Sequence, residues 1–181
     1  AIWRIDETHD YLLERLHRLG QYPDIPFQRN PARLAEWMAT RTLLAELGIK
    51  QRVAYDQNGK PHLEGAGVFL SISHSAKHVV VITHPARRVG VDIEWIGDRI
   101  HRVSHKFVSD SEKAWLPSGD HTRHLYVIWG AKECAFKIYG LGAVDFKEHL
   151  EVLPFEWNEE GSTLIRINKP AEICEYRIFF Q

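Results

Sequence analysis

The sequence has few cysteines, no long apolar run and almost no net charge, and each of these features excludes a class of protein. The two cysteines, Cys134 and Cys174, have no paired spacing, so we expect no disulfide framework and a reduced, cytoplasmic setting. No apolar run approaches the roughly 18 residues that span a membrane, and the N-terminus lacks the apolar centre of a signal peptide. The 23 Lys and Arg residues nearly balance the 24 Asp and Glu residues, which argues against a nucleic-acid partner.

Several familiar catalytic motifs are also absent. The sequence has no P-loop, no HExxH pair and no GxSxG elbow, and Gly140-Leu141-Gly142 lacks the third glycine of a dinucleotide-binding turn. The chain does have 181 residues, of which 44% are hydrophobic and 26% charged. A chain of this length and composition buries a core without disulfides, so we expect a folded protein.

Caps, turns and periodicity predict the elements of the first half. Thr8 and Asn30 are placed to cap helices, and Pro31 favours the first turn of the second helix. Alternating or β-branched segments predict strands. The expected order is a strand at 2–6, a helix after Thr8, a loop over 21–29, a helix after Asn30, and strands at 52–56, 68–73 and 78–83.

The same signals predict the elements of the second half. Ser109 and Glu112 have the spacing of a capping box that begins a short helix. A longer helix is expected from about His121 to Tyr139, ended by Gly140. The expected strands lie at 89–95, 148–157, 163–167 and 173–180.

The two halves therefore have a similar order of elements. Each begins with a strand, continues through a helical stretch and a longer helix, and ends in strands, which predicts an α+β fold with a duplicated unit. Residues 85–88 contain the break between the halves, so we expect domains at residues 1–85 and 86–181. That junction is too short for a flexible tether, and the halves should pack directly as an intramolecular pseudodimer.

Three carboxylates form the strongest candidate site. Asp92 and Glu94 share one face of the predicted strand because strand side chains alternate, and they lie among apolar residues. With Glu133 on the later helix, they offer oxygen ligands that suit Mg²⁺ or Mn²⁺ better than zinc. The alternative is an amphipathic strand with two exposed acids.

Two further segments contain groups that could meet phosphate. Glu133 and Lys137 share a helix face at i and i+4, which indicates either a metal ligand beside a phosphate contact or a simple surface pair. Lys132, one residue from that face, could reach another phosphate oxygen. Ser73 and His74 lie in a Ser-Ile-Ser-His-Ser segment at a strand end, where hydroxyl and imidazole groups either bind phosphate or cap a turn.

Four segments together resemble the 4′-phosphopantetheinyl transferase superfamily. Each is a weak signal alone, whereas the ordered set is specific to that family. In chain order they are the Asn-Gly-Lys-Pro turn at 58–61, Phe-Leu-Ser-Ile-Ser-His-Ser at 69–75, Gly-Val-Asp-Ile-Glu at 90–94, and the Trp-x-x-Lys-Glu-x-x-x-Lys pattern at 129–137.

The resemblance implies roles for these residues. It makes Asp92, Glu94 and Glu133 the ligands of Mg²⁺, with Mn²⁺ as an alternative, and Glu133 also the base. Lys137 would contact the pyrophosphate of coenzyme A, which is the co-substrate. The remaining coenzyme A contacts that it implies are Lys60, Ser73, His74 and either Arg33 or Arg41, the last two both on the long helix of the first half. From its place beside the Glu133 and Lys137 face, Lys132 is expected to add a further contact with coenzyme A.

The implied reaction moves the phosphopantetheine arm of coenzyme A to a serine of an acyl or peptidyl carrier protein and releases adenosine 3′,5′-bisphosphate. The chain resembles the longer, monomeric members of the family, which have two halves in one chain. Because carrier proteins are acidic, we expect a basic patch drawn from Arg87, Arg88, Arg99, Arg102 and Lys106. The alternatives are a metal-dependent phosphohydrolase and a non-enzymatic protein that binds coenzyme A.

Overall fold

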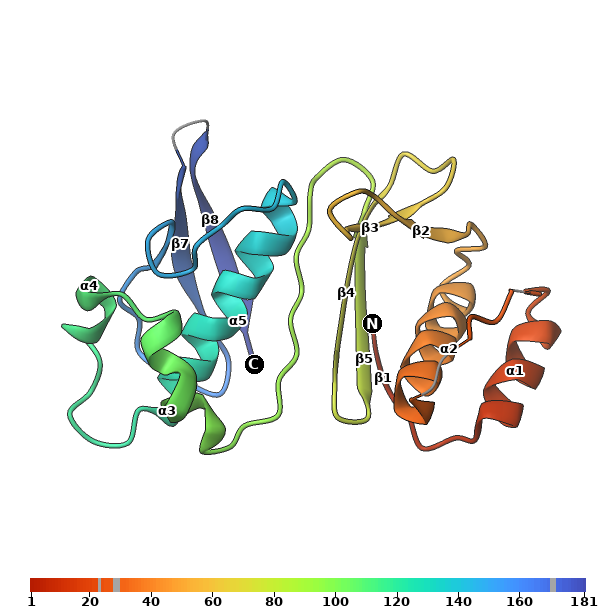
Figure 1. Cartoon of the computed structure of the whole chain (residues 1–181), viewed down its shortest axis with the longest axis horizontal. Coiled ribbons are helices and arrows are strands. Elements are labelled where there is room, and N and C mark those ends of the chain that lie inside the picture. Colours follow the sequence, from red (N-terminus) through yellow and green to blue (C-terminus); the bar gives the residue numbers. More distant parts are fainter. Residues whose placement is uncertain (23, 28–29, 170–171) are drawn as a thin grey trace. The chain divides into compact units, whose positions relative to one another are not determined.

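The chain folds into two compact units, Ala1–Ile93 and Glu94–Gln181. This computed structural model describes residues 1–22, 24–27, 30–169 and 172–181. The boundary between the units falls inside the segment that was predicted as a strand at 89–95, rather than at 85/86. Each unit contains helices and antiparallel sheet, in agreement with the α+β prediction (Figure 1).

Unit 1 begins with β1 (Ile2–Arg4) and two helices whose caps match the sequence signals. Thr8 accepts a hydrogen bond from the backbone N–H of Tyr11 at the start of α1 (His9–Arg18). Asn30 accepts one from the N–H of Ala32 at the start of α2 (Pro31–Glu46). Of the predicted loop at 21–29, residues 23, 28 and 29 lie outside the described residues, and the rest carry no helix or strand.

The strands of unit 1 form two antiparallel sheets. Strands β2 (Val53–Tyr55) and β3 (Pro61–Leu63) pair as a hairpin. Strands β4 (Phe69–Ser75) and β5 (His78–His84) join β1 in a second sheet with the order β1-β5-β4. Leu70, Val79 and Val81 of this sheet join a core with side chains from both helices. Because β4 alternates, Leu70 and Ile72 contribute to the core, and Ser71 and Ser73 lie on the opposite face.

The predicted strand at 89–95 is not formed. Residues 88–97 have neither strand nor helix, and in Figure 1 they run as an extended loop. Part of this segment, Val91 and Asp92, is bonded instead to side chains of β4. The alternating sequence therefore predicted the extended backbone correctly, but the prediction that this backbone pairs with a neighbouring strand was wrong.

Unit 2 places one long helix against one antiparallel sheet. The capping box at Ser109–Glu112 begins α4 as predicted, and Gly140, in the left-handed region at φ 68°, ends α5. The sheet has the order β6-β7-β8, and α5 lies across it in Figure 1. The elements are α3 (Arg99–Val103), η1 (Ser104–Lys106), α4 (Asp110–Lys113), α5 (Thr122–Tyr139), β6 (Leu150–Val152), β7 (Gly161–Lys169) and β8 (Glu172–Phe180).

The core of unit 2 forms between α5 and this sheet. Leu125 and Ile128 of the helix and Ile165 and Ile167 of β7 are essentially inaccessible to solvent. Unit 2 begins with the irregular segment rather than with a strand comparable to β1. The two units thus share helices and a three-stranded antiparallel sheet but differ in strand order.

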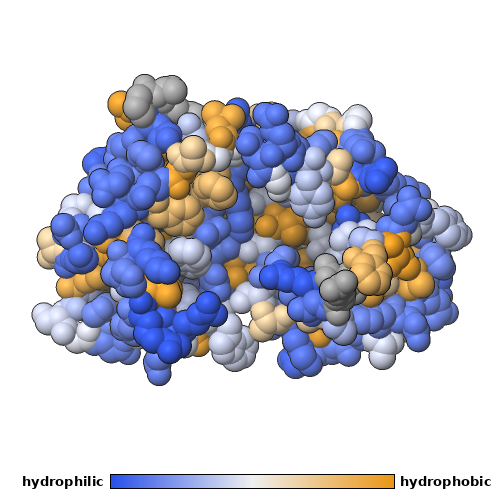
Figure 2. Space-filling model, in the orientation of Figure 1, coloured by the Kyte–Doolittle hydropathy of each residue, from blue (hydrophilic) through white to orange (hydrophobic). Residues whose placement is uncertain are grey.

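Several large apolar side chains are exposed on the described surface. Figure 2 shows mostly hydrophilic residues on the visible face, with hydrophobic residues in separate patches. Within the described ranges, no helix combines the length and the apolar character needed to cross a bilayer.

Candidate functional site

Asp92 is held by the polar face of β4. Its Oδ1 atom accepts a 2.8 Å hydrogen bond from the hydroxyl of Ser73, and its Oδ2 atom is also buried. Two residues earlier on β4, the Ser71 hydroxyl accepts a 3.1 Å hydrogen bond from the N–H of Val91. Both serines are buried, at 3% and 8% exposure. Two hydroxyls of one strand therefore fix the backbone and the carboxylate of consecutive residues.

His74 lies on the other face of β4, toward α2. Its ring nitrogen Nδ1 is 3.4 Å from Glu36 Oε2, and Arg33 Nη1 is 3.0 Å from the same oxygen and 3.2 Å from the imidazole. The side chains of Ser73 and His74, both expected as coenzyme A contacts, therefore lie on opposite faces of β4, and their contact with that ligand stays a prediction. Neighbouring residues of a strand point to opposite faces, and the Ser73 hydroxyl is already donated to Asp92.

Arg41, the other candidate arginine, packs on an aromatic ring. Its guanidinium lies 3.7 Å from the centre of the Trp37 ring and donates to the Trp37 carbonyl at 3.2 Å. Burial lowers the pKa of Arg41, Tyr55 opposes that effect, and the nearby positive charge of Arg52 adds to it. Arg33 is more exposed and carries its ion pair with Glu36, so the two arginines have different surroundings on one helix.

Lys60 lies in the turn of the β2–β3 hairpin, beside another cation. The carboxylate of Asp56 accepts hydrogen bonds from the N–H groups of Asn58 and Lys60, which shapes the predicted Asn-Gly turn. Partial burial lowers the pKa of Lys60, and the positive charge of Arg88 lowers it further. Two like charges that are held near one another favour an anion as a third partner.

Glu94 is exposed and is held by the long helix of unit 2. Its Oε1 atom accepts a 2.8 Å bond from the indole N–H of Trp129. Tyr126 lies three residues before Trp129 on α5, and Gly97 lies three residues after Glu94. The hydroxyl of Tyr126 bonds to the N–H and to the carbonyl of Gly97, at 3.2 and 3.1 Å. Because positions i and i+3 share a helix face, α5 holds the segment 94–97 at two points.

Glu133 and Lys137 are both half-buried on α5. Their spacing of four residues in a regular helix places them on one face, as predicted. The described ranges contain no group of three His, Cys, Asp or Glu side chains arranged to hold a metal ion. Asp92 belongs to unit 1, whereas Glu94 and Glu133 belong to unit 2, so the three-carboxylate metal site stays a prediction.

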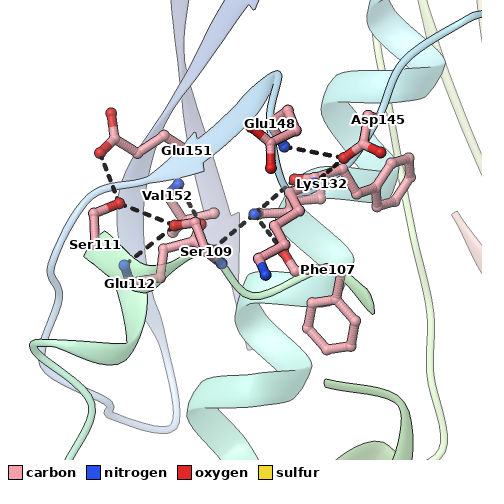
Figure 3. A network of polar contacts seen from close by, with 11 residues as sticks. Phe107, Ser109, Ser111, Glu112, Lys132, Asp145, Glu148, Glu151 and Val152 are labelled. Carbon is pink, nitrogen blue, oxygen red and sulfur yellow. Dashed lines mark hydrogen bonds and ion pairs between the residues drawn. The ribbon is translucent and has the colours of Figure 1, made fainter. Parts of the chain in front are cut away.

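Lys132 is not available to a phosphate. Its ammonium group is fully buried and donates to Glu112 Oε2 at 2.8 Å, to the Phe107 carbonyl at 2.6 Å and to the Phe146 carbonyl at 2.8 Å (Figure 3). These bonds use all three of its N–H donors. Burial lowers the pKa of Lys132, and Glu112 opposes that effect. The prediction that Lys132 contacts coenzyme A is therefore wrong, because the side chain enters the interior.

Glu112 completes this buried network from the other side. Its carboxylate accepts the N–H of Ser109 at 2.7 Å and the N–H of Val152 at 2.8 Å, in addition to Lys132. A single carboxylate thereby joins the capping box of α4, strand β6 and helix α5 (Figure 3). The capping-box signal identified the bond to Ser109, but no sequence signal identified the other two.

Sequence reasoning also missed two supporting residues, Ser71 and Trp129. Ser71 lies in the quoted serine-rich segment, and a buried hydroxyl at i−2 from Ser73 could have been inferred from strand alternation. Trp129 begins the quoted Trp-x-x-Lys-Glu pattern, but no role in the site was predicted for it. Its indole N–H is a donor that needs an acceptor when it lies next to a core, and this signal points to a polar partner without identifying it.

Comparison with known proteins agrees with the motif pattern. A family profile described as the 4′-phosphopantetheinyl transferase superfamily matches residues 88–179, half of the chain. A curated relative, 4′-phosphopantetheinyl transferase gsp of Aneurinibacillus migulanus, is 29% identical over 158 residues, which cover 81% of this chain and 63% of the relative. The chain therefore spans less than two thirds of that relative's length.

Proposed function

Because the chain belongs to the 4′-phosphopantetheinyl transferase superfamily, we propose that it transfers the phosphopantetheine arm of coenzyme A to a serine of an acyl or peptidyl carrier protein. The observation that carries this proposal is the support given to the motif carboxylates. Asp92 is fixed by a buried hydroxyl and Glu94 by an indole N–H. Carboxylates held in this way suit a role that depends on their direction.

The basic residues of unit 1 support coenzyme A as the co-substrate. Burial is the largest cause of the lowered pKa of Lys60 and of Arg41, and the nearby positive charges of Arg88 and Arg52 lower the two pKa values further. A polyanion bound beside such pairs would relieve their repulsion. Coenzyme A carries a pyrophosphate and a 3′-phosphate, so it offers several anionic groups to Lys60, His74 and one of the two candidate arginines.

The carboxylates support a divalent cation. Asp92, Glu94 and Glu133 offer only oxygen donors, which are the ligands of Mg²⁺ and Mn²⁺. When bound, such an ion neutralises charge on the phosphates and polarises the phosphorus that is attacked. These oxygen donors therefore fit a divalent cation, and we propose the three carboxylates as its ligands.

The remaining chemistry falls to Glu133 and Lys137. In the proposed reaction the serine hydroxyl forms an O–P bond, and the bond from that phosphorus to the 5′-phosphate of the nucleotide breaks. Glu133 takes the serine proton, directly or through water, and Lys137 neutralises or protonates the phosphate that leaves. Phosphoryl transfer needs mainly positioning and charge stabilisation, which is the contribution of these side chains.

A basic and apolar surface of unit 2 supports an acidic carrier protein as the partner. Trp95 and Ile96 are 70% and 53% exposed. They precede α3 and η1, which carry the exposed cations Arg99, Arg102 and Lys106. An apolar centre with charged neighbours is typical of a protein interface, and its positive charge would steer an acidic partner.

Mass spectrometry of the carrier protein tests this function. We expect an apo carrier protein to gain one phosphopantetheine arm when it is incubated with the chain, coenzyme A and Mg²⁺. Asp92→Ala should abolish the gain, and Asp98→Ala, an exposed acid of the next segment, should not. Binding of coenzyme A without transfer to any of several carriers would contradict the proposal and favour a binding protein. Cleavage of coenzyme A without a carrier would favour a hydrolase.

The role of His74 has its own test. Its replacement by alanine should weaken binding of coenzyme A more than binding of 3′-dephospho-coenzyme A, measured by calorimetry. An equal effect on both ligands would contradict a contact with the 3′-phosphate. Light scattering of the active chain tests the proposal that it acts as a monomer.

A further inference from the structure

Helix α5 holds the segment that carries Glu94 through two aromatic side chains. The indole N–H of Trp129 donates to Glu94 Oε1 at 2.8 Å. The hydroxyl of Tyr126 accepts the Gly97 N–H and donates to the Gly97 carbonyl. The second contact restrains the backbone that follows Glu94, and the first restrains the carboxylate itself.

Trp129 is in turn held by the buried network of Lys132. The rings of Phe107 and Phe146 lie 5.1 and 5.5 Å from the Trp129 ring, measured between ring centres. The backbone carbonyls of these same two residues accept hydrogen bonds from Lys132. Lys132 also bonds to Glu112, and both side chains are fully buried. A chain of contacts thus runs from the interior of unit 2 to an exposed carboxylate.

We infer, on the basis of the function proposed above, that Trp129 is a positioning residue for Glu94. The Lys132–Glu112 pair would fix the ring surface against which Trp129 rests. Glu94 is exposed, and a free glutamate side chain samples many rotamers that a cation must restrict on binding. A bond to Oε1 limits the directions in which Oε2 can face a cation, and such preorganisation reduces the entropic cost of binding.

The energetics of the contact favour this role over a purely structural one. The bond between Trp129 and Glu94 is exposed to solvent, and exposed hydrogen bonds add little to folding stability because water offers equivalent partners. Supporting hydrogen bonds to metal ligands have a larger effect on metal affinity, typically 10- to 100-fold. Removal of the indole N–H should therefore change cation binding more than it changes folding.

Binding of Mn²⁺ to the full chain tests the inference without measuring transfer. Free Mn²⁺ is followed by its paramagnetic resonance signal, with coenzyme A present at a constant concentration. Trp129→Phe keeps an aromatic ring beside Phe107 and Phe146 but removes the N–H. We expect it to weaken Mn²⁺ binding about tenfold. Trp115→Phe is the matched control, because Trp115 is a half-buried tryptophan of the same core that packs on Phe155, and it should leave the affinity unchanged.

A double-mutant cycle separates positioning from general damage. If Trp129 acts through Glu94, then adding Trp129→Phe to Glu94→Gln should cause no further loss of Mn²⁺ affinity. Additive losses, or a Trp129→Phe protein that binds Mn²⁺ like the wild type, would overturn the inference and leave the proposed function intact. Failure of the wild-type chain to bind Mn²⁺ would instead contradict the metal assignment on which both rest. Should Trp129→Phe not fold by circular dichroism, Trp129→Met, which also lacks a side-chain donor, provides the same comparison.

Discussion

The two units support their motif carboxylates in different ways. In unit 1, Asp92 is bonded by a neutral hydroxyl from the buried face of a strand. In unit 2, Glu94 is bonded by an indole at an exposed position, and the charged pair Lys132–Glu112 lies behind that indole. The buried polar residues of the described part of unit 1 are all hydroxyl side chains, whereas those of unit 2 include this ion pair.

This difference has a physical consequence. A neutral hydroxyl can be removed at the cost of one hydrogen bond, but a buried charge that loses its partner stays in an apolar interior. The units also differ in charge, since unit 1 has 12 Lys and Arg against 10 Asp and Glu, and unit 2 has 11 against 14. The near-zero net charge of the chain is therefore the sum of a slightly basic unit and a slightly acidic one. Because unit 2 contains the buried Lys132–Glu112 pair, its stability should be more sensitive to substitutions in the interior.

The largest expected effect comes from breaking the buried ion pair. Lys132→Met should destabilise unit 2 by about 3–5 kcal/mol, because Glu112 is left charged and buried without its cation. Thr42→Val is the control in unit 1, where the buried hydroxyl donates to the Met38 carbonyl of its own helix, and it should cost about 1 kcal/mol. Hydrogen exchange measured by mass spectrometry reports both units separately.

The matching double variant sharpens this result. Adding Glu112→Gln to Lys132→Met removes both charges and should restore part of the lost protection in residues 94–181. If the double variant is as unstable as the sum of the single variants, the pair is not coupled in the way proposed. Loss of protection in residues 1–93 as well would show that the two units do not respond independently.

A smaller effect is expected from the two supports of the carboxylates. Ser73→Ala should destabilise unit 1 by about 1–3 kcal/mol, because the carboxylate of Asp92 loses a buried hydrogen bond. Trp129→Phe should destabilise unit 2 by less than about 1 kcal/mol, because its bond to Glu94 is exposed. Urea unfolding of both variants measures the order, and a larger loss for Trp129→Phe would contradict the distinction between buried and exposed supports.

The smallest expected effect is a pH dependence in unit 2. Burial lowers the pKa of His124, which stacks on Phe155, and the nearby His121 lowers it further. The unfolded chain therefore binds this proton more readily than the folded one, and stability falls as pH drops through about 6.5 toward the lower folded pKa. His124→Gln should flatten this decline between about pH 7 and pH 5 in thermal unfolding. An unchanged decline would assign it to other groups.

Local signals in the sequence predicted the elements well because caps and turns act over a few residues. Thr8, Asn30, Ser109 and Gly140 each perform the capping role that was expected of them. The strand predicted at 89–95 is not formed, because strand pairing depends on more than the local sequence. Alternation of apolar and polar residues identifies extended backbone, but a strand also needs a neighbouring strand with which it pairs. Here the Ser73 hydroxyl of β4 donates to the Asp92 side chain instead.

The sequence by itself determined the family, the order of the motifs and the identity of the carboxylates, because these depend on residue type and spacing along the chain. Only the tertiary structure decided what each motif side chain contacts. Lys132 and Glu133 are neighbours in the motif, yet Lys132 enters the core and bonds to residues 14, 20 and 25 positions away. Such partners are set by packing between distant segments, which the spacing of a motif does not encode.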